Sequence, residues 1–352
     1  MIKRIFALIL SLACLFCFAA CNDGDADNSD GTTDTEATEK DTAELNCEHE
    51  YEEEILSEPE EFKGGLVKKT CKLCGKVKEE TIPATKTLKI LAIGNSFSVD
   101  AMAYLWKICD SAGYGEVVLG NLFIGGCTLE MHWENISTNA PAYIYYKTDE
   151  NGEWKTNPNT AVETALLDEE WDIITLQQAS GSSGLSGTYV HLQRILDYIE
   201  SKSTNDNAEV YWHMTWAYQG DSGHGEFAKY DHDQKLMYES IANSVSSQVL
   251  PRRDIKGVIP VGTVIQNLRT SHVGDTLTRD GYHLNCDVAR YAAALTWYRS
   301  LTGLPLEQVN FVPKTKDYPE MKQDIDRKTL ETIYAAVEAA LETPLEVTDM
   351  SK

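Results

Sequence analysis

The stretch Leu88-Lys-Ile-Leu-Ala-Ile-Gly-Asn-Ser-Phe-Ser98 decides the fold prediction for this chain. Its first six residues read as a buried β-strand, because all but Lys89 are apolar. The Gly-Asn-Ser turn that follows leads into a helical pattern over 101–112. A strand that turns directly into a helix is the repeating unit of α/β proteins. Ser96 is therefore expected at the carboxyl end of a strand and at the N-terminus of a helix.

The same alternation continues along the chain. Strands are predicted over 116–124, 172–176, 209–215 and 257–264, with helical periodicity between them and a long apolar helix over 288–301. An Asn151-Gly152 turn between aromatic arms predicts a hairpin insertion over 143–154. Together these patterns predict a doubly wound, three-layer, flavodoxin-like α/β domain with a mostly parallel sheet over 86–345.

Two segments of this domain carry the residues of a nucleophilic site. Ser96 lies where backbone N–H groups and the helix dipole stabilise an oxyanion, although a serine after a strand is more often only a helix cap, a role that Ser98 can also fill. Near the other end of the chain, Asp280 and His283 are separated by a Gly-Tyr turn. Both can face one cleft, where the imidazole accepts the serine proton and the carboxylate fixes its tautomer.

Gly94-Asn-Ser-Phe-Ser98, Leu176-Gln-Gln178 and Arg279-Asp-Gly-Tyr-His-Leu284 together resemble the motifs of SGNH, or GDSL-like, hydrolases, and most closely a bacterial lipoprotein branch of them. The resemblance covers about 86–303. It implies Ser96 as nucleophile, His283 as base, Asp280 as the orienting carboxylate and the Gly126 amide as an oxyanion donor. The chain departs from the family where an asparagine donor is expected, after the 172–176 strand. We expect Gln178 to replace it; Gln177 is the other candidate, or a core residue.

The resemblance implies a serine esterase that needs no cofactor for catalysis, and the N-terminal residues described below predict its export. By analogy and from the compartment, short acyl esters, O-acetyl groups on carbohydrates above all, are the expected substrates. A lipase or thioesterase is the enzymatic alternative, and a non-catalytic glycan-binding lipoprotein is the alternative from another class. Further residues have two possible roles each. Trp133 and Trp216 are sugar platforms or core residues, His213 is a cleft or core residue, and His224 and His232 are metal ligands or loop residues.

The N-terminus predicts export. Lys3 and Arg4 precede an uncharged run over 5–20, and small residues stand directly before Cys21, as in a lipoprotein signal peptide with a lipidated cysteine. A transmembrane anchor is the alternative, but 16 residues are short of the roughly 20 that a bilayer requires. We expect a signal peptide over 1–20, an acidic spacer over 21–45, and a membrane anchor at Cys21 on the extracytoplasmic face.

A small Cys-rich module is predicted over 46–85. Cys71-Lys-Leu-Cys74-Gly75 has the spacing of half a tetrahedral zinc site, and Cys47 with His49 can supply the other ligands. The segment resembles small cysteine-rich repeats in surface proteins of Gram-positive gut bacteria. The alternative is one disulfide with a cysteine left over. Four protein ligands would make the zinc structural.

Charge excludes one class of partner. The chain has 55 acidic and 31 basic side chains, for a net charge of −24, and two thirds of that charge falls on residues 22–62. The remaining third of the net charge is ordinary for a soluble domain. A nucleic-acid partner is therefore not expected.

Overall fold

The computed structural model of this protein describes residues 47–60, 64–82 and 84–351. The predicted signal peptide, Cys21 and the acidic spacer lie outside these residues. Within the described ranges, no helix combines the length and the apolar character needed to cross a bilayer.

A seven-stranded sheet forms the centre of the larger domain, in the order β10-β9-β8-β4-β5-β6-β7. The strands from β10 to β5 run parallel, and β6 and β7 add an antiparallel edge. Their bounds are β4 (Thr87–Gly94), β5 (Glu116–Phe123), β6 (Tyr143–Thr148), β7 (Trp154–Thr160), β8 (Ile173–Leu176), β9 (Glu209–His213) and β10 (Gly257–Ile259). All of β8 and the last five residues of β4 are buried, as expected for a parallel sheet covered on both faces.

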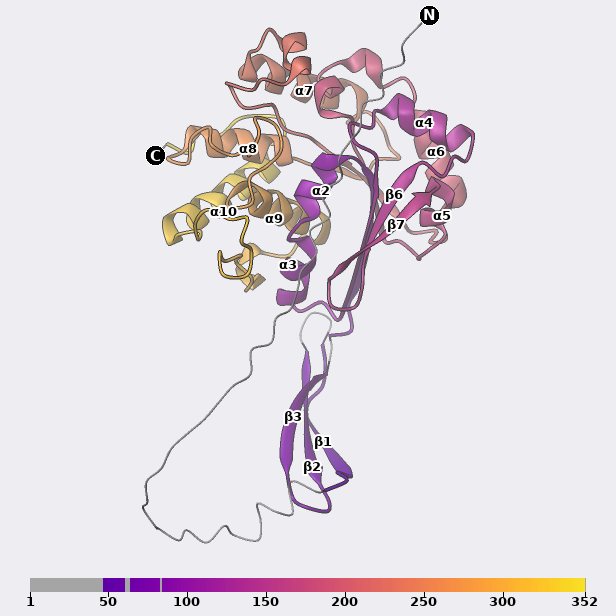
Figure 1. The fold of residues 1–352 in the computed structure, drawn as a ribbon, viewed down its shortest axis with the longest axis vertical. Coiled ribbons are helices and arrows are strands. Elements are labelled where there is room, and N and C mark those ends of the chain that lie inside the picture. Colours follow the sequence, from indigo (N-terminus) through magenta and orange to yellow (C-terminus); the bar gives the residue numbers. More distant parts are fainter. Residues whose placement is uncertain (1–46, 61–63, 83, 352) are drawn as a thin grey trace, which may run out of the picture.

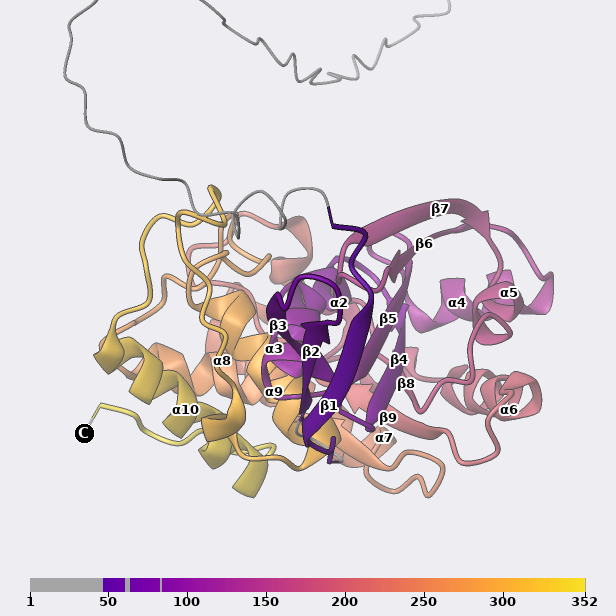
Figure 2. The ribbon, with the colours of Figure 1, turned by 90° about the horizontal axis from the view of Figure 1, so that it is seen from below.

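Helices cover both faces of this sheet, which confirms the three-layer α/β prediction. Helices α2, α3, α8, α9 and α10 pack together on one face, and α4, α5 and α6 on the other (Figure 2). The helix bounds are α2 (Ser96–Met102), α3 (Leu105–Ser111), α4 (Leu129–Ser137), α5 (Val162–Leu166), α6 (Leu192–Lys202), α7 (Gln234–Gln248), α8 (Val261–Thr270), α9 (Ala289–Thr302) and α10 (Arg327–Glu342). The apolar helix predicted over 288–301 is α9, which contacts four other helices and is buried along most of its length.

Two element predictions need correction. The helix expected over 101–112 starts earlier, at Ser96, and is broken into α2 and α3 at Tyr104, whose hydroxyl donates to the Cys286 carbonyl at 2.7 Å. The strand expected over 257–264 ends at Ile259. Pro260 has no N–H to donate to a ladder, and the chain turns there into α8. The predicted hairpin is confirmed as β6 and β7.

A separate antiparallel sheet precedes the domain, in the order β1-β2-β3, and Figure 1 shows it standing apart from the helical layers. Its strands are β1 (Tyr51–Ser57), β2 (Gly65–Cys71) and β3 (Val77–Ile82). Among its described side chains, Val67 and Cys71 are buried, while β1 is exposed along nearly its whole length. The sheet therefore has almost no apolar core.

Candidate active site

Ser96 occupies the first turn of α2, directly after the carboxyl end of β4. Asn95 caps this helix: its backbone is extended and its side-chain oxygen accepts from the Phe97 amide at 3.0 Å. Ser98 binds the Asn95 carbonyl and the Asn121 side chain instead. Neither capping role falls to Ser96, so its hydroxyl is left for another partner. Gly94 permits this tight turn, because a Cβ there would lie 2.5 Å from the Ser98 hydroxyl.

The partner of Ser96 is His283. The His283 Nε2 atom lies 2.8 Å from Ser96 Oγ, and its Nδ1 atom lies 2.7 Å from Asp280 Oδ2. The other Asp280 oxygen accepts from the backbone amides of His283 and Tyr282. The Gly281 φ of +92° allows this tight loop, a conformation in which other residues are strained. The structure thus brings the three residues of the predicted triad into one hydrogen-bonded chain.

The electrostatics of the loop keep Asp280 ionised. Desolvation acts to raise the pKa of this carboxyl, but the hydrogen bonds from the His283 ring and from the two amides lower it below its ordinary value. An ionised Asp280 holds the proton of His283 on Nδ1 and leaves Nε2 free to accept a proton from Ser96. This arrangement suits general-base activation of a serine nucleophile.

Aromatic packing supports the loop that carries Asp280 and His283. Trp216 stacks on Phe97 with ring centroids 4.0 Å apart, and its Nε1 donates to the Tyr282 carbonyl at 2.7 Å. Because Trp216 is fully buried, it supports the site and offers no face to a sugar. Trp133 is half-buried, with its ring stacked on His191 and beneath Arg194. Neither tryptophan therefore presents an open platform for a sugar ring.

A buried ion cluster, absent from the sequence prediction, ties α2 to the loop. Asp100 lies one turn after Ser96 with a side chain 1% exposed, and it accepts from both Arg279 and Arg290. Its Oδ2 also accepts from the Leu284 amide at 2.8 Å. Arg279 and Leu284 flank Asp280 and His283 in sequence, so Asp100 clamps the helix of the serine to the loop of the histidine.

The oxyanion prediction requires a correction. The Gln178 amide nitrogen donates to the Thr188 carbonyl and hydroxyl, and its oxygen accepts from Leu129 and Ala179 amides. The side chain is therefore committed to holding the start of α4, and Gln178 is not the expected oxyanion donor. Its polarity reflects buried hydrogen bonding, which the sequence pattern does not distinguish from a catalytic role.

Gln177 also has an internal role. It donates to Asn95 Oδ1 at 2.7 Å and its oxygen lies 2.8 Å from His213 Nδ1. Asn95 in turn donates to the Cys127 carbonyl at 3.2 Å. This buried chain joins segments at the carboxyl ends of β9, β8, β4 and β5. His213 therefore belongs to the core, where burial lowers its pKa to about 3.

Gly126 remains as a candidate oxyanion donor together with Ser96 itself. It lies in the exposed turn after β5 with φ +62°, and its amide makes no hydrogen bond to any described residue. The Ser96 amide, at the start of α2, likewise has no partner in the described ranges. Two free amides at neighbouring strand ends fit the stabilisation of a tetrahedral oxyanion.

The Cys-rich module brings its four predicted ligands together. Cys47, His49, Cys71 and Cys74 place their ligating atoms within 4.8 Å of one another. The Cys47 and Cys71 sulfurs are 3.7 Å apart, too far for a disulfide, while His49 Nδ1 lies 3.4 Å and 3.3 Å from the Cys71 and Cys74 sulfurs. Ligands about 2.0–2.3 Å from a tetrahedral zinc lie roughly 3.3–3.8 Å apart, so the set fits zinc.

His224 and His232 do not form a metal site. His224 accepts from the Glu226 amide and caps a short 3-10 helix, Gly225–Tyr230, and His232 packs against Phe227. In the described part of the chain, the Cys47 group is the only cluster of at least three ligand-type side chains close enough for a metal. These two histidines are therefore loop residues.

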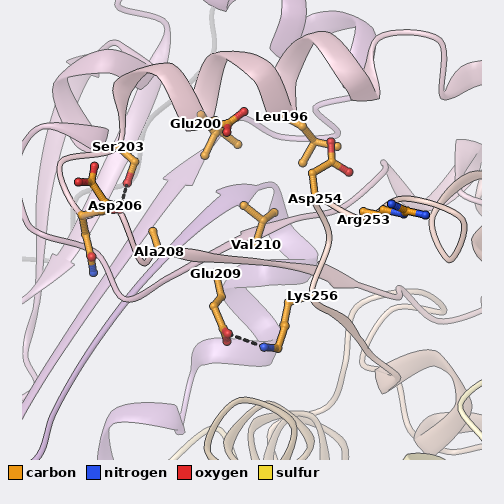
Figure 3. Close-up of a pocket in the computed structure, with 12 residues that line it drawn as sticks. Leu196, Glu200, Ser203, Asp206, Ala208, Glu209, Val210, Arg253, Asp254 and Lys256 are labelled. Atoms are coloured by element: carbon orange, nitrogen blue, oxygen red, sulfur yellow. Dashed lines mark hydrogen bonds and ion pairs between the residues drawn. The ribbon is translucent and has the colours of Figure 1, made fainter.

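A hollow of about 420 Å³ lies at the opposite end of the sheet, where β9 and β10 begin (Figure 3). Its lining includes Glu209 and Lys256, which form an ion pair at 2.7 Å. None of the predicted site residues reaches it, and ligands of open α/β sheets bind at the carboxyl ends of the strands. The hollow is not the active site.

Comparisons with known proteins place the chain in a family. A family model described as "Domain of unknown function (DUF4886)" matches residues 89–327. The crystal structure of a DUF4886 family protein from Bacteroides uniformis ATCC 8492 is 39% identical, with a TM-score of 0.69, and the match covers 75% of this chain and 98% of that one. The crystal structure of TesA matches with 15% identity and a TM-score of 0.38, over 62% of this chain and 99% of that chain, which is too distant to bear on function. No curated protein matches. On the extent of the family match, this chain belongs to the DUF4886 family.

Proposed function

We propose that this protein is a serine esterase that hydrolyses short acyl esters, with Ser96 as nucleophile, His283 as general base and Asp280 as its orienting carboxylate. The observation that carries the proposal is the continuous chain from Ser96 Oγ to His283 and Asp280, at 2.8 Å and 2.7 Å, at the carboxyl end of β4. The resemblance of the surrounding motifs to SGNH hydrolases supports the same reaction class.

The reaction runs in two halves. Ser96 Oγ attacks the ester carbonyl while His283 takes its proton, and the amides of Ser96 and Gly126 stabilise the negative oxygen. His283 then gives the proton to the leaving alcohol as the acyl-enzyme forms. Water attacks the acyl group in the second half under the same base, which releases the acid and restores Ser96. The residues supply every group that this chemistry needs, so we propose no cofactor for it.

Hydrolysis of p-nitrophenyl acetate by the wild-type protein and by Ser96→Ala tests the proposal. We expect the substitution to lower kcat by at least about 10⁴-fold, because nucleophile and base act as a unit. Thermal unfolding should stay nearly unchanged, since the hydroxyl is half-exposed. Turnover retained in Ser96→Ala would refute the nucleophile assignment, and a wild-type protein inactive on every short ester would favour the non-catalytic glycan-binding alternative.

The same proposal includes a location and a structural metal. The sequence before residue 47 supports export and lipid anchoring at Cys21, on the extracytoplasmic face of the membrane. The mutual distances in the Cys47, His49, Cys71 and Cys74 cluster support one tetrahedral zinc. With four protein ligands such a zinc has no open position for water, so its role would be structural. O-acetylated carbohydrate is the substrate class that compartment and analogy favour.

A further inference from the structure

A pocket of about 380 Å³ lies between α2, the β6–β7 hairpin and the segment that joins α9 to α10. This volume is within the range of about 300–1,000 Å³ that small-molecule sites occupy. Its walls include Val99, Tyr104, Asn121, Tyr146, Trp154 and Tyr318. Neither the triad nor the oxyanion amides line it, so it is a separate feature of the described structure.

The pocket lies along the face of α2 that also carries Ser96. Val99 and Ala103 line its floor, and they stand three and seven residues after Ser96. Residues spaced by three or four lie along one face of a helix, and each residue advances the axis by about 1.5 Å. The floor therefore begins about 5 Å and ends about 10 Å from Ser96 along the helix. The lining therefore starts about one helical turn after Ser96, on the face of α2 that carries the serine.

Four of the nine residues that line the pocket are aromatic. Tyr104 and Tyr318 meet edge to face with centroids 5.0 Å apart, on the side of the α9–α10 segment. Tyr146 and Trp154 come from the hairpin and are half-buried, so each keeps part of its ring surface open. Rings of this kind offer flat, weakly polar faces, against which the C–H groups of a sugar ring pack.

Polar groups complete the pocket. Asn121 lines the pocket, and its Oδ1 accepts from Ser98 at 3.0 Å. Arg290 and Glu320 line the same pocket, and Arg290 uses only Nε and Nη2 on Asp100. The site therefore calls for a ligand with both an apolar face and hydroxyl oxygens.

We infer that this pocket binds the sugar ring of an acylated carbohydrate and presents its ester to Ser96. The inference rests on the proposed esterase function and deepens it. A fatty acyl chain fits less well, because it would cover the polar side chain of Asn121 and the charges of Arg290 and Glu320 without offering them a hydrogen bond. Aliphatic walls, which such chains prefer, are limited here to Val99 and Ala103.

The test compares a mono-O-acetylated methyl pyranoside with p-nitrophenyl acetate as substrates of the full chain. For Trp154→Ala and Tyr318→Ala, we expect the ratio of kcat/KM on the sugar ester to kcat/KM on the nitrophenyl ester to fall at least tenfold. Trp154→Phe, which keeps an aromatic face, should recover most of that ratio. Tyr198→Ala is the control, because this half-buried tyrosine lies on α6, on the other face of the sheet.

Direct binding separates this inference from the esterase proposal. Calorimetric titration of Ser96→Ala with the same acetylated pyranoside should give a Kd that weakens at least tenfold when Trp154→Ala is added. If the ratio and the Kd both stay within twofold in the Trp154 and Tyr318 variants, the inference is wrong, even if Ser96→Ala abolishes hydrolysis. A wild-type preference for octanoyl over acetyl esters that Trp154→Ala removes would also overturn it, since the pocket would then hold an acyl chain.

Discussion

The α/β domain covers both faces of its sheet with helices, whereas the β1–β3 sheet leaves almost every side chain of β1 exposed. In the domain, β4 is buried over its last five residues and α9 on nearly all sides. In the small sheet, Val67 and Cys71 are the buried apolar side chains among those described. A sheet of three strands without a core is expected to be marginal on its own.

The two regions therefore depend on different sources of order. The domain positions its catalytic candidates with buried hydrogen bonds and one ion cluster set into a packed interior. The small sheet gathers four metal-ligating side chains at one end, where a single ion can replace the missing core. Changes to buried polar groups should accordingly act on the domain, and metal removal on the small sheet alone.

Asp100→Asn should have the largest effect on the domain. It keeps the shape of the side chain but leaves Arg279 and Arg290 facing each other without their shared anion. Removing one member of a buried ion pair costs about 3–5 kcal/mol of unfolding free energy. Because Asp100 also fixes the loop that carries His283, kcat on p-nitrophenyl acetate should fall about 10²-fold at temperatures where the variant is folded.

Asp110→Asn, on the exposed side of α3, is the matched control and should change neither quantity measurably. Urea unfolding and steady-state kinetics on the two variants decide the point. A folded Asp100→Asn variant with wild-type kcat would show that Asp100 stabilises the fold without positioning the site.

Gln178→Ala should act on stability and not on catalysis. Its loss leaves the Leu129 amide and the Thr188 carbonyl without their partner, which lowers the unfolding free energy by about 1–3 kcal/mol. We expect kcat to stay within threefold of wild type. Gln177→Ala is the comparison, because it breaks the chain to Asn95 at the start of α2 and should lower kcat more. A 10²-fold loss of kcat in Gln178→Ala alone would restore Gln178 as an oxyanion donor.

Most of the fold could be predicted from the sequence, because the strands are short apolar runs between helical patterns. This alternation is typical of a mostly parallel sheet. It failed at Pro260, where an apolar run of similar composition turns into a helix, and at Tyr104, where a contact 182 residues away accompanies a helix break. Periodicity cannot show contacts between distant segments. It therefore locates elements better than it locates their ends.

Some residues of the candidate site could likewise be predicted from the sequence, and others could not. Ser96, Asp280 and His283 were predictable, since two short motifs at strand and helix boundaries imply one edge of a sheet. Asp100 was not, because a lone aspartate in a helix resembles any solvated residue until its two arginines are placed. The oxyanion role predicted for Gln178 was wrong, because the sequence does not show whether a polar side chain at a strand end faces the substrate or the protein interior.

Mild acid should weaken the domain through its buried histidines. Burial lowers the pKa of His213 to about 3 and that of His132 to about 4, from an ordinary value near 6.5. Between pH 6.5 and about 4, both histidines bind a proton in the unfolded chain but not in the folded chain. The unfolding free energy therefore falls as the pH decreases through this range. The slope reaches about 1.4 kcal/mol per pH unit for each histidine. Urea unfolding of wild type and His213→Asn at pH 7, 6 and 5 should show a shallower slope in the variant; equal slopes would contradict a neutral, buried His213.

Metal removal should have the smallest effect on the domain, namely none that can be measured. Elemental analysis of the purified chain should find about one zinc, and Cys71→Ser should abolish its binding, because three remaining ligands hold zinc far less tightly. In that variant, or after chelation, amide hydrogens of β1–β3 should exchange rapidly, while the melting temperature of the α/β domain and the hydrolysis of p-nitrophenyl acetate stay at wild-type values.

Loss of hydrolysis on chelation would instead mean that the two regions are coupled or that catalysis needs the metal. Slow exchange in metal-free β1–β3 would show that the small sheet is stable without an ion, and the contrast between the two regions would then fail.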